Sequence, residues 1–388
     1  MMRFLNIYKI LSINITIFLT IIVLIELTSY LVLSRTHLLS GLLKKISLKE
    51  IEIDYRVNGP NYKNKDFARR HFRDLKRVKE LYFPYTIWKN RPLTTDTINI
   101  DETFKRKTFF SKDCSPDCKK IFVFGGSTLF GEGVSDERTI PSYLAKIISG
   151  KIKTLNFEVR NYGNRGYQST QELIRLIMLL ERGMVPDLVV FYDGVNDIIT
   201  SVYNPGIAGY HQKYDFIEQK FNTNSFSSLL MSSKFVELLH LINERFLKRS
   251  SKESIADLDN LIKRGVDSYI TNLKIVDGLS KRYSFDYYAF LQPTLVTSEK
   301  KMTSYEKTYY DESANLQKIY KQSYERINRI DMTNYSFENL SMVFKNVKEN
   351  IFIDFAHSGD NGNFMVANDI FHKLIPIINK WSQDGKVN

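Results

Sequence analysis

Short apolar runs alternate with amphipathic stretches from about residue 119 to residue 380. The apolar runs end in glycine or polar residues, which is typical of buried strands. The stretches between them place apolar residues at helical spacing, as Ile140, Leu144 and Ile148 show. The predicted strands are 121–124, 156–160, 186–192, 287–291 and 351–353, and the predicted helices include 169–182, 255–282, 305–330 and 362–380.

This alternation predicts an α/β domain over residues 119–388, because strands that alternate with helices form a parallel sheet covered on both faces. The expected architecture therefore has three layers, α/β/α. Between about residues 199 and 257 the alternation is lost. We expect this stretch to be an insertion at the edge where the strands end, and hence a cap over a pocket.

A long apolar run occupies the N-terminal region. It lies between Lys9 and Arg35 and contains a single charge, Glu26. The run is long enough to span a bilayer as a helix. A cleaved signal peptide would have a shorter apolar region that ends at small residues, and no such site is present. Residues 1–35 are therefore expected to hold an uncleaved signal anchor, which crosses the membrane through residues 10–34.

Residues 36–118 are polar and basic with scattered aromatic residues, and we expect them to wrap over the α/β domain as an extension. The two cysteines of the chain, Cys114 and Cys118, are too few for a zinc site without nearby histidines. Outside the cytoplasm they could close a small disulfide, whereas inside it they would be two thiols.

The formal net charge is +12, which raises the question of an anionic partner. The lysines and arginines are spread through the chain and form no dense basic block with interleaved aromatics, so nucleic-acid binding is not expected. Attraction to an anionic membrane surface or a polysaccharide accounts for the charge equally well. Basic residues flank the apolar run on both sides, so charge does not set its orientation.

The run 121–124 ends at Gly125 and Gly126, and Ser127 follows directly. A P-loop would close with Gly-Lys-Ser/Thr, and a dinucleotide fingerprint would need G-x-G-x-x-G; neither is present. The nucleophile elbow of α/β-hydrolases needs glycine two residues after the serine, where this chain has Leu129. Taken alone, the turn predicts only a position where ligands bind, beyond the carboxyl end of a strand.

Three other predicted strand ends carry comparable residues, and a parallel sheet brings all four loops to one edge. These loops are 125–127, 161–166, 194–196 and 354–357. Together they supply the hydroxyl of Ser127, the imidazole of His357, the carboxylate of Asp354, the amide of Asn196 and the unobstructed N–H of Gly166. Acyl transfer through a serine needs such a nucleophile, base, orienting acid and oxyanion hole.

The motifs Gly-Gly-Ser-Thr, Asn-x-Gly-x-x-Gly, Gly-x-Asn-Asp and Asp-x-x-His occur in this order. They resemble the four blocks of the SGNH (GDSL-type) hydrolase superfamily, over roughly residues 119–380. The resemblance implies a flavodoxin-like sheet. One departure from the family pattern is that the aspartate usually found before the serine is Gly126 here.

By this resemblance Ser127 is the nucleophile, His357 the base and Asp354 its orienter. The backbone N–H groups of Ser127 and Gly166 and the side chain of Asn196 would form the oxyanion hole. No metal or other cofactor is expected. The remaining histidines (His37, His71, His211, His240 and His372) have no comparable carboxylate context and are given no role.

The resemblance implies a serine esterase, and the apolar run adds a membrane anchor, so we expect a membrane-anchored esterase whose catalytic domain lies outside the cytoplasm. Family members with a single N-terminal anchor often act on acyl groups of surface carbohydrate, so an O-acetyl ester on a glycan is the leading substrate. The same residues would serve an O-acyltransferase, in which a sugar hydroxyl replaces water. A non-catalytic glycan-binding or scaffold protein of surface-polymer assembly is the alternative from another class.

Overall fold

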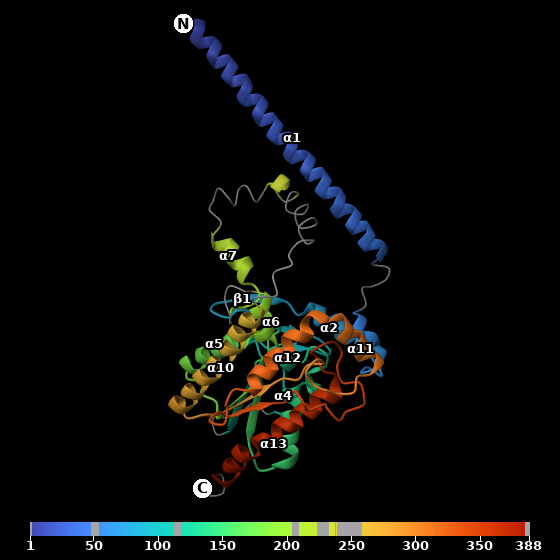
Figure 1. The fold of residues 1–388 in the computed structure, drawn as a ribbon, viewed down its shortest axis with the longest axis vertical. Helices are drawn as coiled ribbons and strands as arrows, with labels where there is room; N and C mark the ends of the chain where they lie inside the picture. The colour runs from blue at the N-terminus through green and yellow to red at the C-terminus, as the bar shows by residue number, and fades with distance from the viewer. Residues whose placement is uncertain are drawn as a thin grey trace. The chain divides into compact units, whose positions relative to one another are not determined.

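The computed structural model describes residues 2–47, 54–111, 118–203, 209–222, 233–236, 238 and 258–384 (Figure 1). The chain forms two compact units. Met1–Ile53 and Asp215–Ile255 make up the first, here called the helical unit. Asp54–Tyr214 and Ala256–Asn388 make up the second, here called the α/β unit.

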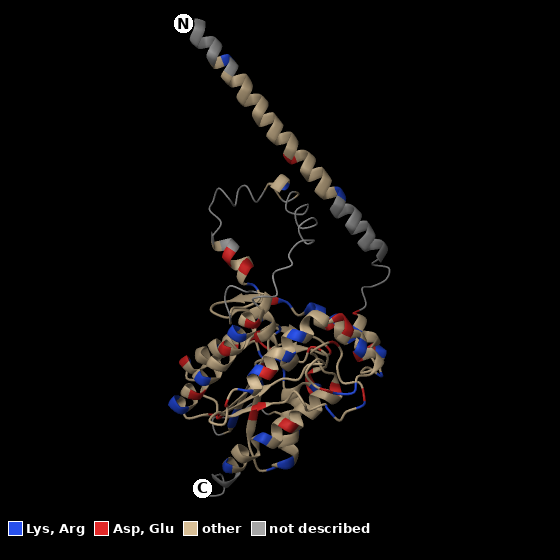
Figure 2. Ribbon diagram, in the orientation of Figure 1, with Lys and Arg blue, Asp and Glu red and all other residues tan. Residues whose placement is uncertain are grey.

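The helical unit contains one long helix, α1 (Met2–Ser47). Its segment Leu11–Arg35 has a mean hydropathy of 2.3 and is long and apolar enough to cross a membrane, in agreement with the span expected from the sequence. Figure 2 shows this helix with hardly any charge along its middle. Glu26 accepts a hydrogen bond from the backbone N–H of Lys234 at 2.8 Å, so the carboxylate has a polar partner within the unit.

Only part of the predicted cap, 199–257, falls within the described residues. Its beginning belongs to α6 (Val195–Tyr203), which packs against the long helix α10 (Leu258–Tyr283). A second helix, α7 (Tyr214–Asn222), follows. The remainder of the predicted cap lies largely outside the described residues. Of the two alternatives left open for the cysteines, the structure has Cys118 in a disulfide, whereas Cys114 also lies outside the described residues.

The α/β unit is built on a parallel five-stranded sheet with the strand order β6-β5-β7-β8-β9. The strands are β5 (Lys119–Gly125), β6 (Phe157–Asn161), β7 (Leu188–Asp193), β8 (Asp286–Leu291) and β9 (Phe337–Asn339). In the order of these five strands along the chain this is 2-1-3-4-5, the flavodoxin-like arrangement. The predicted fold class is therefore confirmed.

Successive residues of β5 face opposite helical layers, as a buried strand requires. Phe122 and Phe124 pack in the cluster that includes α6, α10, α5 (Ser169–Glu181) and α12 (Ala314–Asn328). Ile121 and Val123 pack in the opposite cluster. There the helices are α4 (Ile140–Lys151) and α13 (Asp360–Asp384). The sheet is thus buried on both faces, and its carboxyl edge is left for loops.

The predicted last strand, 351–353, is wrong. Here the chain makes only an isolated antiparallel bridge between Phe352 and Ser358, and β9 takes the edge position beside β8. The backbone N–H groups of Ile351 and Phe352 donate to the Oε1 atom of Glu306, at 3.0 and 3.1 Å. A side chain of α11 (Ser304–Glu312) therefore satisfies donors that a neighbouring strand would otherwise accept from.

Residues 54–111 belong to the α/β unit and pack beside its central sheet. They form the 3₁₀ helix η1 (Tyr55–Asn58), helix α2 (Lys65–Arg77) and two hairpins. The hairpin strands are β1 (Glu80–Phe83), β2 (Ile87–Asn90), β3 (Leu93–Thr94) and β4 (Asn99–Ile100). Phe72 and Leu75 of α2 share a buried cluster with Phe130 and Ile353, two residues next to the carboxyl edge of the sheet. The extension is thus part of one hydrophobic core with that edge.

Glu306→Gln is expected to destabilise the α/β unit by about 3–5 kcal/mol, because it removes one partner of a buried ion pair. Lys300 Nζ lies 2.7 Å from the carboxylate of Glu306, and both side chains are fully buried. The exposed pair Lys307–Asp311 on the same helix provides the control. Asp311→Asn should change the free energy of unfolding by less than about 1 kcal/mol. Thermal unfolding followed by circular dichroism measures both; equal effects would contradict the role given to Glu306.

Candidate active site

Ser127 stands at the carboxyl end of β5, where Gly125 and Gly126 end the strand and the short helix α3 (Ser127–Phe130) begins. Its Oγ lies 2.7 Å from Nε2 of His357, in position to donate a hydrogen bond. As the first residue of α3, Ser127 also has a backbone N–H without an acceptor inside the helix. The hydroxyl and this N–H therefore belong to the same strand end.

Asp354 and His357 lie in one tight loop before α13. Nδ1 of His357 donates to Asp354 Oδ2 at 2.8 Å, and Asp354 Oδ1 also accepts the backbone N–H groups of Ala356 and His357 at 3.0 and 2.8 Å. Ile353 N–H closes the loop by donating to His357 O at 2.9 Å. Serine, imidazole and carboxylate thus form a continuous hydrogen-bonded chain.

Electrostatics favour the charged form of both loop side chains. Burial alone would raise the pKa of Asp354, but its contacts with His357 outweigh this and hold that pKa well below its usual range. Burial likewise disfavours the imidazolium form of His357, but the nearby carboxylates of Asp354 and Glu132 raise its pKa overall. His357 is therefore a stronger base than an isolated histidine.

Asn196 is the second residue of α6, which follows β7 after Gly194, and its Nδ2 donates to the carbonyl of Tyr167 at 2.7 Å. This amide lies against Gly126, because a Cβ built on Gly126 would be only 2.5 Å from Asn196 Nδ2. An aspartate could not stand at position 126 without displacing that amide. The departure noted in the sequence therefore has a steric counterpart in the structure.

The loop after β6 offers two glycine N–H groups, which differ in availability. The N–H of Gly163 donates to Asn161 Oδ1 at 2.9 Å and is thus occupied. Gly166 has a left-handed backbone with φ +74°, and no hydrogen bond of its N–H is found within the described part of the chain. A Cβ there would also meet the side-chain amide of Gln212. Gly166 is thus the better candidate donor of the two.

Two charged residues beside Ser127, His357 and Asp354 were not identified from the sequence. Glu132 Oε2 lies 3.7 Å from Nε2 of His357, and Arg56 Nη1 lies 3.2 Å from Glu132 Oε1 and 3.4 Å from Asp354 Oδ2. Burial would raise the pKa of Glu132, but His357, Arg165 and Arg56 lower it to about 2. Glu132 lies only five residues after Ser127 in the sequence, whereas Arg56 belongs to no motif.

The extension holds the loops at the carboxyl edge of the sheet by hydrogen bonds. Trp88 Nε1 donates to Arg165 O at 3.1 Å, and the backbone N–H of Asn90 donates to Asn164 Oδ1 at the same distance. The fully buried Arg106 donates to the carbonyls of Phe130, Gly131, Val134 and Thr97 and to Asp136. These contacts position both the Gly166 loop and the loop after Ser127.

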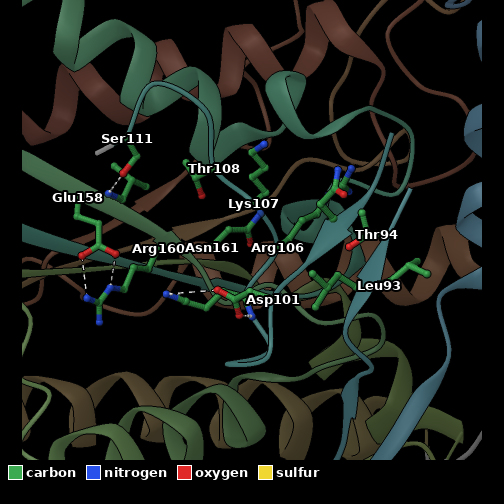
Figure 3. A pocket seen from close by; sticks show the side chains of 14 residues that line it. Leu93, Thr94, Asp101, Arg106, Lys107, Thr108, Ser111, Glu158, Arg160 and Asn161 are labelled. Atoms are coloured by element: carbon green, nitrogen blue, oxygen red, sulfur yellow. Dashed lines mark hydrogen bonds and ion pairs between the residues drawn. The ribbon is translucent and has the colours of Figure 1, made fainter. Parts of the chain in front are cut away.

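Figure 3 shows a separate cavity of about 460 Å³ at the outer side of β6, where Arg106 and Asn161 form part of the wall. Its charged side chains are largely paired within the wall, as in the two contacts of 2.7 Å between Arg160 and Glu158. Ser127 and His357 do not line it.

Three buried carboxyl groups lie close together: Glu172 of α5, Asp193 at the end of β7 and Asp197 of α6. Asp197 accepts hydrogen bonds from the N–H and hydroxyl of Ser169, and Asp193 accepts one from Tyr269 at 2.8 Å. Burial, together with the proximity of Asp197, raises the pKa of Asp193 to about 7. Burial raises that of Asp197 to about 6, and burial and both aspartates raise that of Glu172 well above its ordinary value.

Within the described residues, no group of three or more His, Cys, Asp or Glu side chains is arranged to hold a metal ion. The groups that converge are instead a hydroxyl, an imidazole paired with a carboxylate, a side-chain amide and backbone N–H groups. This set can activate a hydroxyl as a nucleophile and stabilise an oxyanion beside it.

Comparisons with known proteins find similar solved structures, whereas no protein-family model and no curated protein matches the chain. A member of the lipolytic protein G-D-S-L family from Veillonella parvula is 13% identical, with a TM-score of 0.36 over 68% of this chain and 99% of that one. The acetyl xylan esterase AlAXEase is 16% identical, with a TM-score of 0.37 over 66% and 100%. An acetylxylan esterase from Geobacillus stearothermophilus is 15% identical, with a TM-score of 0.33 over 66% and 94%. At this similarity, conclusions about chemistry rest on the site itself.

Gly126→Ala is expected to slow the reaction of Ser127 with a fluorophosphonate probe by about 100-fold, the effect of losing one oxyanion-hole donor. The added methyl group would displace the amide of Asn196 while leaving the triad in place. Gly150→Ala in α4 is the control, because a Cβ there meets nothing within 4 Å. If both variants reacted at the wild-type rate, Asn196 would have no role in the oxyanion hole.

Glu172→Gln is expected to reduce the loss of stability that these three buried carboxyl groups cause as pH rises. Their folded pKa values are raised above the ordinary 3.8 and 4.5 of Asp and Glu, so between about pH 4 and 7 they bind more protons in the folded state than in the unfolded state. Their contribution to stability therefore falls with rising pH across this window, and a neutral amide at position 172 removes part of the fall.

The measurement is the melting temperature of wild type and variant at about pH 5 and at about pH 8. The three carboxyl groups lose most of their protons between these two pH values. Glu181→Gln, an exposed substitution at the other end of α5, should leave the difference between the two pH values unchanged. The same pH dependence in wild type and Glu172→Gln would contradict the assignment.

Proposed function

We propose that this chain is a membrane-anchored serine hydrolase that acts on carboxylic esters. The observation that carries the proposal is the hydrogen-bonded chain Ser127–His357–Asp354 beside the amide of Asn196. A free serine hydroxyl is a weak nucleophile, and a neighbouring base held by a carboxylate is what activates it.

In the proposed reaction, Ser127 Oγ attacks the ester carbonyl while its proton passes to His357 Nε2. The carbonyl oxygen becomes an oxyanion and accepts hydrogen bonds from the N–H groups of Ser127 and Gly166 and from Asn196 Nδ2. The bond to the alcohol then breaks, and His357 protonates the departing oxygen. Asp354 keeps the ring oriented and stabilises its cationic form.

The product of this first half is an acyl group esterified to Ser127. Water then attacks the acyl carbonyl with His357 as the base, and the bond to Oγ breaks with return of the proton to the serine. If a sugar hydroxyl replaced water, the same steps would transfer the acyl group instead. We propose hydrolysis as the reaction. Acyl transfer would be detected as an acylated sugar, formed when an acceptor sugar is supplied.

For the substrate we propose an O-acetyl ester on a glycan outside the cytoplasm. The resemblance to the SGNH hydrolases supports an ester, and the apolar helix Leu11–Arg35 supports a position at a membrane. The net charge of +12 favours an anionic surface polymer in the surroundings. Figure 2 shows Lys and Arg interspersed with Asp and Glu on the described α/β unit, so this attraction would be diffuse.

Ser127→Ala is expected to lower ester turnover by at least about 10³-fold, since the acyl-enzyme can no longer form. Full-length protein in detergent micelles would be assayed on aryl esters of short and long acyl chains and on O-acetylated glycans. Ser304→Ala, at an exposed serine of α11, should retain full activity. If wild type and Ser127→Ala were equally inactive on all of these substrates, the protein would be better explained as a non-catalytic scaffold than as an esterase.

A further inference from the structure

A second carboxylate stands on the reacting side of the imidazole. Asp354 pairs with Nδ1 of His357, the nitrogen away from the serine, at 2.8 Å. Glu132 Oε2 lies 3.7 Å from Nε2, the nitrogen that contacts Ser127 Oγ. That distance is too long for a hydrogen bond but short for a charge interaction in a site where both side chains are largely buried.

The backbone of Glu132 is held firmly on both sides. Its N–H donates to Ser127 O at 3.2 Å, and its carbonyl accepts Nε2–H of the buried His71 at 2.9 Å. Arg106 donates to the carbonyl of Gly131 at 2.7 Å and to that of Val134 at the same distance. Hydrogen bonds to Ser127, His71 and Arg106 thus fix the backbone on both sides of Glu132. They hold its carboxylate at a defined distance from the imidazole of His357.

Two arginines fix the side chain. Arg56 Nη1 contacts both carboxylates that flank His357, Glu132 at 3.2 Å and Asp354 at 3.4 Å. Arg165 Nε lies 3.2 Å from Glu132 Oε2 on the other side. The charged groups facing His357 are therefore Asp354 from its own loop, Glu132 from the loop after α3 and Arg56 from η1.

We propose that Glu132 is a positioning residue that stabilises the imidazolium form of His357 while Nε2 carries the serine proton. The proposal rests on the esterase function above, in which that proton moves from Ser127 Oγ to Nε2 and then to the departing alcohol. Glu132 takes no proton and makes no bond in these steps. Its charge faces the side of the ring on which the transferred proton sits, and Arg56 keeps the two carboxylates from repelling each other.

A purely structural role for Glu132 would be to join Arg56 to Arg165. That role needs an acceptor between the two guanidinium groups, and a neutral amide of the same shape would supply one. It would not need a negative charge 3.7 Å from Nε2. The two roles therefore differ in what Glu132→Gln does: the structural role predicts an unchanged titration of His357, and the positioning role predicts a changed one.

The direct test is titration of His357 by nuclear magnetic resonance in full-length protein in detergent micelles, with ¹³C-labelled histidine and His357→Gln to assign the signal. In Glu132→Gln the pKa of His357 is expected to fall. In parallel, the acid limb of the rate of fluorophosphonate labelling against pH should move to lower pH. The rate on the plateau should drop by roughly tenfold, because the imidazolium in the transition state loses a stabilising charge.

Glu137→Gln is the matched control. Glu137 lies in the same segment between α3 and α4 as Glu132, and its side chain is 44% exposed. It should leave both the titration and the pH profile unchanged. Glu132→Asp keeps the charge but withdraws it from Nε2, and a smaller fall in the pKa of His357 is expected. This variant also serves if Glu132→Gln does not fold.

An unchanged titration of His357 in Glu132→Gln, or in Glu132→Asp if that is the variant that folds, would overturn the proposal. This result differs from failure of the proposed function. A wild-type protein that cleaves no ester would remove the esterase, whereas the titration of His357 needs no substrate and still reports whether Glu132 acts on the imidazole.

Discussion

The buried guanidinium of Arg106 is the interaction on which the arrangement of the site depends. The loop after Ser127 leaves the sheet with carbonyl groups that no neighbouring strand pairs, and a buried carbonyl without a donor is costly. Arg106 donates to three of them, Phe130 O, Gly131 O and Val134 O, while Asp136 balances its charge. The nucleophile, Glu132 and the extension are thereby fixed to one another.

At the other loops of the carboxyl edge, too, a side chain from elsewhere in the chain binds polar groups of the loop. Trp88 holds the backbone beside Gly166, and Arg56 holds the carboxylates beside His357. Glu306 binds the two N–H groups that lead into the Asp354–His357 loop. Each is a side chain from outside the loop that satisfies buried polar groups within it. The sheet sets where the loops begin, and these side chains set where the reactive atoms lie.

The parts of the fold that could be read from the sequence are those with a local pattern. The runs that became β5, β7 and β8 are mostly apolar, and Ser127 and Asn196 lie within three residues of the ends of two of these strands. Residues 351–353 carry the same pattern but not the same structure, because their N–H groups bind Glu306, more than forty residues earlier in the chain. Arg56 could not be identified in this way, because its contacts with Glu132 and Asp354 join residues that are far apart in the sequence and follow no motif.

The extension also bears on where the protein can be divided. Residues 54–111 precede the first strand of the central sheet, and a domain boundary drawn just before β5 would look natural. A fragment cut there would lack Arg56, Trp88 and Arg106, and so would keep the complete triad while losing the groups that hold its loops. A soluble form freed from the apolar helix should therefore start no later than Asp54, the residue that pairs with Arg56 at 2.8 Å.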